Sequence, residues 1–135
     1  MTNESYLAPM QVALEGQPDA PVSQITQGWF GRWFIRNFVE PSPGTKRISA
    51  PLQIRPSTRI EVSILERFVA SNGALRKTIS QAERKDINRI RFKNPFVPLI
   101  RFTVGTGFQI LTAHERRHLL QAERVRNAPS FPASS

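Results

Sequence analysis

Residues 106–126 read TGFQILTAHERRHLLQAERVR, and their pattern predicts the last helix of the chain. Side chains on one face of an α-helix recur every three or four residues, and this stretch keeps that interval over five turns. Its only imidazoles lie on that face, separated by four residues and therefore one turn apart. The predicted stripe is Phe108, Leu111, His114, His118, Ala122 and Val125.

The histidine pair admits two interpretations. His114 and His118 on an inward helix face are the kind of ligands with which metal sites inside helical bundles are built. Gln121 follows His118 by three residues, so its amide can orient a ligand imidazole from the outer shell. The alternative is a pair of partly buried histidines that only hydrogen-bond within the core. Both interpretations stay open here, because two ligands rarely hold a metal by themselves.

The letters HERRH also match the H-E-x-x-H motif of zinc proteases. That chemistry needs a glutamate that activates the metal-bound water and a third ligand further along the chain. No histidine follows His118, and Glu123 lies only five residues on, within the same predicted helix. The pattern therefore does not favour a protease.

Three further segments predict helices. The first has an apolar stripe, Tyr6, Met10 and Leu14, and ends at a C-cap glycine, Gly16. Residues 58–83 predict the clearest helix, with Thr58 and Glu61 as a capping box. Asn94 and Pro95 predict the start of another short helix. The core stripe expected on residues 58–83 comprises Leu65, Phe68, Leu75, Ile79 and Ala82, widened by Ile64 and Val69.

The stretch GWFGRWFIRNFV, residues 28–39, concentrates aromatic side chains. Phe30, Trp33, Phe34 and Phe38 fit one helical face, while Arg32 and Arg36 pair on another. A membrane-surface or base-stacking patch is one interpretation. A short helix that buries its rings in the core is the other, and the shortness of the segment favours it. The elements together predict an all-α protein in which short helices pack as a bundle.

Composition narrows the classes of function. The 135-residue chain has a formal net charge of +9 and no cysteine, so disulfides, thiolate metal sites and cysteine nucleophiles are excluded. Its basic residues are spread along the chain among acidic ones, which disfavours a nucleic-acid partner. No stretch reaches the roughly 18 apolar residues of a membrane span, and the N-terminus lacks the basic region of a signal peptide. We therefore expect a cytoplasmic protein with no membrane partner.

Residues 28–57 and 94–125, with the predicted helix between them, resemble the DinB/YfiT-like superfamily, and most closely its DinB-like domain proteins. The resemblance covers roughly residues 3–127 and is most specific in a terminal H-x-R-R-H-x-x-Q signature. It implies an up-down-down-up four-helix bundle, often dimeric, and a divalent metal, commonly zinc or nickel, bound by three histidines. Some relatives are transferases that use a low-molecular-weight thiol. The matching residues are His114, Arg116, Arg117, His118 and Gln121.

The chain departs from this pattern at the third ligand. The family's first-helix histidine has no counterpart, and TNESYLAPMQ looks like the second half of that helix. The resemblance thus implies a single DinB-like domain over residues 1–127 with a truncated first helix. Two explanations of the truncation are an internal start at Met1 and a truncated paralogue. Residues 128–135 are expected to form a disordered tail.

Two functions follow from the resemblance. The first is a metal-dependent enzyme of the thiol S-transferase or hydrolase type. In it, His114 and His118 bind the metal, Gln121 and Arg117 lie in the outer shell, and a third ligand must be supplied. The alternative is a non-catalytic helical bundle or dimerisation module whose histidines are structural.

Overall fold

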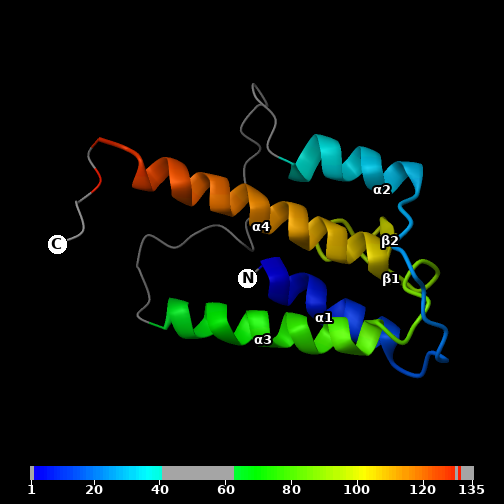
Figure 1. Cartoon of the computed structure of the whole chain (residues 1–135). Coiled ribbons are helices and arrows are strands. Elements are labelled where there is room, and N and C mark those ends of the chain that lie inside the picture. The colour runs from blue at the N-terminus through cyan, green and yellow to red at the C-terminus, as the bar shows by residue number, and fades with distance from the viewer. Residues whose placement is uncertain (1, 41–62, 130, 132–135) are drawn as a thin grey trace.

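The computed structural model describes residues 2–40, 63–129 and 131 (Figure 1). The described part is mostly helical, as expected, and also contains two short strands. Its elements in chain order are α1 (Thr2–Leu14), α2 (Trp29–Phe34), the π-helical continuation η1 (Ile35–Val39), α3 (Ile64–Ala82), β1 (Arg91–Lys93), β2 (Arg101–Thr103) and α4 (Val104–Arg126).

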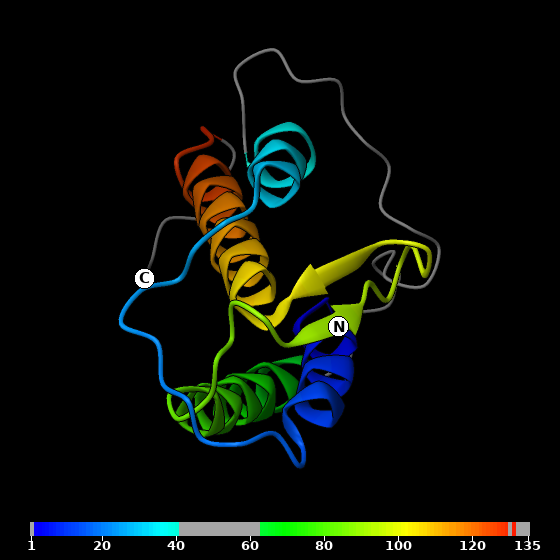
Figure 2. The ribbon, with the colours of Figure 1, turned by 90° about the vertical axis from the view of Figure 1, so that its right-hand side faces the viewer.

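Helix α4 lies at the centre of the arrangement. It packs against α1 on one side and against η1 on the other, and α1 in turn packs against α3. Figure 2 shows this order end-on, with α2 and η1 on the opposite side of α4 from α3. The direction of the chain alternates from α1 to α4 (Figure 1). The expected up-down-down-up four-helix bundle is therefore not confirmed.

The expectation of an all-α protein is wrong between the last two long helices. Strands β1 and β2 pair antiparallel, with Phe92 opposite Phe102, and both rings are buried. Asn94 was expected to cap a helix, and its Oδ1 does accept hydrogen bonds from the backbone N–H groups of Phe96 and Val97. Its own N–H, however, donates to the Ile100 carbonyl and closes the hairpin loop. Pro98 lacks the N–H that a continuing helix would need.

The stripe predicted on the first helix is confirmed. Tyr6, Met10 and Leu14 are all buried, and the Tyr6 ring meets the Phe92 ring edge-on at 5.9 Å between centroids. Helix α1 ends before Gly16, which has φ +67° and allows the chain to leave the helix in the left-handed region. Pro9 lies inside the helix.

Helix α4 begins at Val104, two residues before the predicted start. Thr103 is its N-cap, and the Thr103 side chain accepts a hydrogen bond from the Thr106 N–H at 3.2 Å. Gly107, which lowers helix propensity, is required by packing: a Cβ there would lie 2.9 Å from Met10 Sδ and from the Phe92 ring. The absence of a side chain lets α1 and β1 approach the α4 backbone closely.

The core stripe predicted on α3 is wrong for most of its residues, because only Ala82 is buried and Leu75 partly buried, while the other five, Ile79 included, are exposed. Leu65 and Phe68 are 73% and 54% exposed, whereas Ser71 and Thr78 are buried. The reason is the position of α1, which packs against the small, polar face of α3. Thr78 Oγ1 accepts a hydrogen bond from Gln11 Nε2 at 2.8 Å and donates one to the Ala74 carbonyl, so its burial is satisfied. The predicted capping box lies outside the described residues.

The aromatic segment is helical, as predicted, and divides between core and surface. The Phe30 and Phe34 rings pack against the buried Phe102 ring, with centroids 6.0 and 5.0 Å away. Trp33 and Phe38, expected on the same face, are 48% and 45% exposed. The core interpretation therefore holds for the two phenylalanines alone.

Two expectations concern the chain as a whole. No helix in the described ranges is long and apolar enough to cross a membrane. The tail expected over residues 128–135 lies largely outside the described residues. The assignment of residues 1–127 to one domain stays a prediction.

Candidate metal centre

The two histidines face each other on α4, beyond the turn where its buried half ends. His114 Nε2 and His118 Nε2 are 3.0 Å apart, and the two rings are nearly perpendicular, with centroids separated by 4.4 Å. His114 is half-buried, while His118 is exposed. The pair thus lies at the boundary between the core and the solvent.

Gln121 determines which nitrogen of His118 carries the proton. His118 Nδ1 lies 2.9 Å from Gln121 Oε1, a carbonyl-type oxygen that only accepts hydrogen bonds. The Nδ1–H group therefore donates to Gln121, and His118 Nε2 keeps its lone pair. His114 Nε2–H then donates to that lone pair. A side-chain acceptor on the distal nitrogen is the usual way in which proteins orient a histidine ligand.

Electrostatics keep His114 neutral. Burial, followed by the neighbouring His118, lowers the pKa of His114 to about 4. Glu115 opposes this shift, and the positive charge of Arg117 adds to it. At neutral pH the His114 imidazole is therefore unprotonated, which is the form that binds metals.

Glu115 is not placed to activate a metal-bound water, as the glutamate of a zinc protease does, because it bonds to another helix. Its Oε1 accepts a hydrogen bond from Asn3 Nδ2 at 3.0 Å, which ties the start of α1 to α4. Asn3 is buried, and its Oδ1 has no hydrogen-bond partner among the described residues. Nothing in the sequence signals this contact, because its two residues are 112 positions apart.

The spacing of the two nitrogens fits chelation of one ion. Two imidazole nitrogens bound about 2.0–2.1 Å from one ion lie about 3.3–3.4 Å apart in a tetrahedral site and about 2.8–3.0 Å apart at the 90° angle of a square site. The observed Nε2–Nε2 separation of 3.0 Å matches the square arrangement and is shorter than the tetrahedral one. Within residues 2–40, 63–129 and 131, however, no group of three or more His, Cys, Asp or Glu side chains could hold a metal. The described residues supply two ligands of a site that needs more.

The other residues expected around the pair differ in their roles. Gln121 contacts His118 directly. Arg117 is partly buried and acts on His114 through its charge, without a hydrogen bond to either ring in the described structure. Ala122 and Val125 continue the predicted stripe but are exposed, so the stripe is buried only in the first half of α4.

None of the protein-family models, curated proteins or solved structures searched matches this chain. The resemblance to DinB-like proteins therefore stays a prediction that rests on the residues quoted for it. What the chain can do follows from the geometry of the histidine pair and from the surfaces around it.

Proposed function

We propose that this chain is a DinB-like helical protein in which His114 and His118 bind a divalent metal, zinc or nickel. The observation that supports the proposal best is the 3.0 Å separation of the two Nε2 atoms, with Gln121 holding the His118 ring from behind. The fold already holds the Nε2 atoms of two neutral imidazoles together, through a hydrogen bond that the ion would replace. Binding would then need the two rings to turn toward the ion and the His114 proton to move from Nε2 to Nδ1.

The proposed activity is a thiol S-transfer or a hydrolysis. A bound divalent metal lowers the pKa of a coordinated thiol or water, so that either attacks as an anion near neutral pH. His114 and His118 supply two ligand nitrogens, and a third ligand comes from outside the described residues. Gln121 keeps the His118 ring in its ligand tautomer, and Arg117 favours neutral His114. The proposed small-molecule partner is a low-molecular-weight thiol, in a cytoplasmic setting.

Calorimetric titration of the purified chain with Zn²⁺ and with Ni²⁺ tests the metal site. We expect one ion per chain, no binding by His118→Ala, and affinity weakened by about 10-fold in Gln121→Ala. Arg116→Ala is the matched control, since Arg116 is an exposed neighbour of the pair on the same helix, and it should bind like the parent chain. Equal binding by the parent chain and His118→Ala would rule the site out.

The second candidate function is a non-catalytic helical module, including a dimerisation module, with structural histidines. The observation that favours it is that His118 needs no metal to satisfy its two ring nitrogens. His118 bonds to Gln121 on one side and to His114 on the other, so its two ring nitrogens both have partners. A chain that binds neither ion but loses stability in His118→Ala would support this function.

A further inference from the structure

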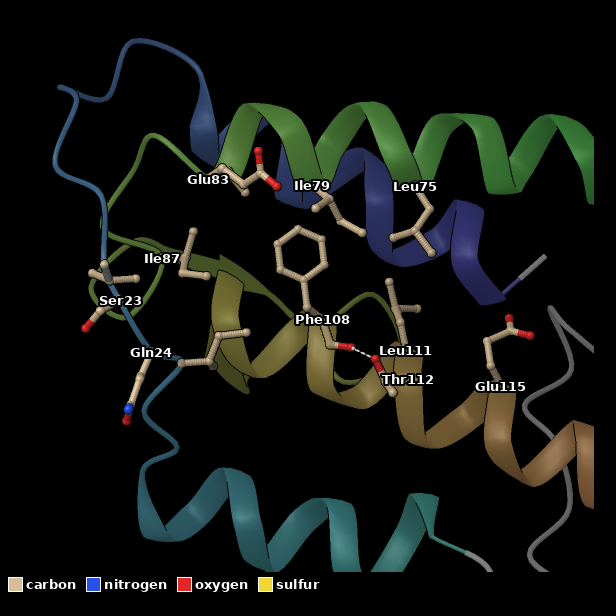
Figure 3. A pocket seen from close by; sticks show the side chains of 13 residues that line it. Ser23, Gln24, Leu75, Ile79, Glu83, Ile87, Phe108, Leu111, Thr112 and Glu115 are labelled. Atoms are coloured by element: carbon tan, nitrogen blue, oxygen red, sulfur yellow. Dashed lines mark hydrogen bonds between the residues drawn. The ribbon is translucent and has the colours of Figure 1, made fainter.

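Apolar side chains meet the solvent in two ways outside the histidine pair. In the cavity of about 340 Å³ between α3 and α4 they face one another, as Ile79 faces Phe108 in Figure 3. In the loop between β1 and β2 they project outward. Val97 is 42% exposed, Leu99 is 97% exposed, and Pro98 between them is exposed as well. A run of three exposed apolar residues is unusual unless a partner covers it.

The loop that carries this run has a defined conformation. The buried Asn94 side chain accepts hydrogen bonds from the N–H groups of Phe96 and Val97. The Ile100 carbonyl accepts a hydrogen bond from the Asn94 N–H, and the Ile100 N–H donates to the Val97 carbonyl. These bonds fix the loop at both ends, so the fold itself holds Leu99 out in the solvent. A loop that is ordered beforehand loses little entropy when a partner binds.

Three cations lie on the outer face of the same hairpin. Side chains alternate between the two faces of a strand, so Arg91, Lys93 and Arg101 point away from the buried phenylalanines of β1 and β2. Lys93 lies directly opposite Arg101, where like charges repel one another. None of the three forms an ion pair with any residue that the structure describes. The sequence has no Asp or Glu between Asp86 and Glu115 that would offset them.

The combination of these charges with an apolar tip indicates the class of partner. Charged side chains on edge strands can block pairing with another sheet, but that role needs no apolar run in the loop. A nucleic acid would bind the cations through its phosphates and leave Leu99 in water. A membrane with anionic lipids satisfies both features, because apolar side chains enter the acyl boundary while Lys and Arg contact the headgroups. The anionic surface also relieves the repulsion between Lys93 and Arg101.

We infer that the β1–β2 hairpin docks this protein on an anionic lipid surface, with Val97 and Leu99 inserted between the lipids and the three cations beside the headgroups. Figure 2 shows the hairpin projecting away from the helices, with its loop at the outer end. Such a contact lies at the membrane surface and needs no helix that spans the bilayer. It replaces the expectation of no membrane partner, which rested on the lack of a span and of a signal peptide. It goes beyond the proposed metal binding and does not depend on it.

Sedimentation with lipid vesicles tests the role of the cations. We expect the chain to bind vesicles of phosphatidylcholine and phosphatidylglycerol in equal parts, not vesicles of phosphatidylcholine alone, and to bind more weakly as salt is added. Lys93→Gln should weaken binding by about five-fold. Lys77→Gln is the matched control, because it removes the same charge from an exposed position on α3, outside the hairpin, and should have little effect.

The apolar tip is tested separately from the charge. Leu99→Ala keeps every cation and should weaken binding to the mixed vesicles by about 10-fold through lost apolar burial. Leu119→Ala is its control, since Leu119 is also exposed, on α4. A fluorophore sensitive to polarity, attached to Leu99→Cys, should shift its emission to the blue on these vesicles, and the same label on Leu119→Cys should not. The chain has no other cysteine to compete for the label.

Three results would each overturn the inference: no sedimentation with the mixed vesicles at low salt, equal weakening by Lys77→Gln and Lys93→Gln, or an unshifted label at position 99 on the bound chain. Circular dichroism of each variant ensures that a loss of binding does not come from unfolding. Binding to a DNA duplex that Lys93→Gln weakens and Leu99→Ala leaves unchanged, without binding to vesicles, would assign the cations to nucleic acid instead.

Discussion

The two halves of α4 have the same apolar periodicity and opposite surroundings. In residues 104–113, Val104, Ile110 and Leu111 are buried among α1, the sheet and η1. In residues 114–126, Leu119 and Val125 are 61% and 59% exposed. The helix is continuous across both halves. Periodicity therefore decides which side chains share a face, while the neighbouring elements decide whether that face is covered.

The histidine pair lies where these two halves meet, and its properties follow from that position. His114, the member nearer the covered half, is buried enough for its pKa to fall to about 4. His118, one turn further on, remains exposed. An imidazole pair at such a boundary combines an unprotonated ring with access from solvent.

The largest effect should come from truncating one leucine in each half. Leu111 is 1% exposed, so Leu111→Ala should lower the free energy of unfolding by about 2–5 kcal/mol through lost burial and the cavity left behind. Leu119→Ala, the same change eight residues later, should alter it by less than about 0.5 kcal/mol in dilute solution. Urea denaturation measures both. Equal losses would show that the second half is as well covered as the first.

Two glycine-to-alanine substitutions should change the stability of the fold in opposite directions, one in the covered half of α4 and one in α3. Gly107→Ala forces a methyl group against Met10 and Phe92 in the covered half of α4, and should destabilise the fold by about 1–3 kcal/mol. Gly73→Ala in α3 meets open space and should stabilise the fold by about 0.5–1 kcal/mol, since alanine favours the helix. Thermal unfolding of both variants at low protein concentration checks the two signs. Stabilisation by Gly107→Ala would contradict the close packing of α1 on α4.

A further prediction concerns the dependence of stability on pH. The pKa of His114 lies near 4 in the fold, below its ordinary value of about 6.5. Between these two pH values the unfolded chain binds more protons than the folded chain, so protonation favours unfolding. The free energy of unfolding is therefore unaffected by the protonation of His114 above pH 6.5 and decreases as the pH falls towards 4. Since the ring is partly exposed, we expect a loss of about 1 kcal/mol after solvent screening. Urea denaturation at pH 7 and at pH 4 measures the difference in the free energy of unfolding. His114→Gln should reduce this difference. If the difference is unchanged in the variant, groups other than His114 cause it.

Local patterns predicted the helices well where one element's own periodicity was sufficient. The stripe of Tyr6, Met10 and Leu14 is buried as expected, and the histidines share a face of α4 because four residues make about one turn. The hydrogen bond between His118 and Gln121 has the same local origin. These relations hold within one helix and need no information about its neighbours.

Relations between distant segments were not predictable in this way. The pairing of β1 with β2 depends on how Asn94 closes a loop, and a helix cap uses the same side-chain hydrogen bonds. The exposure of Leu65 and Phe68 follows from α1 packing on the other face of α3. The contact of Asn3 with Glu115 has no local signal at all.

The sequence by itself determined that the chain is mostly helical, which side chains line each helix face, and that its two histidines stand one turn apart. Only the tertiary structure decided that half of α4 and the start of α3 remain uncovered, and that His114 is buried enough to stay neutral. The physical reason is that helix periodicity depends on hydrogen bonds within a few residues of chain. Burial and the pKa shifts that follow from it depend on which distant segments exclude water.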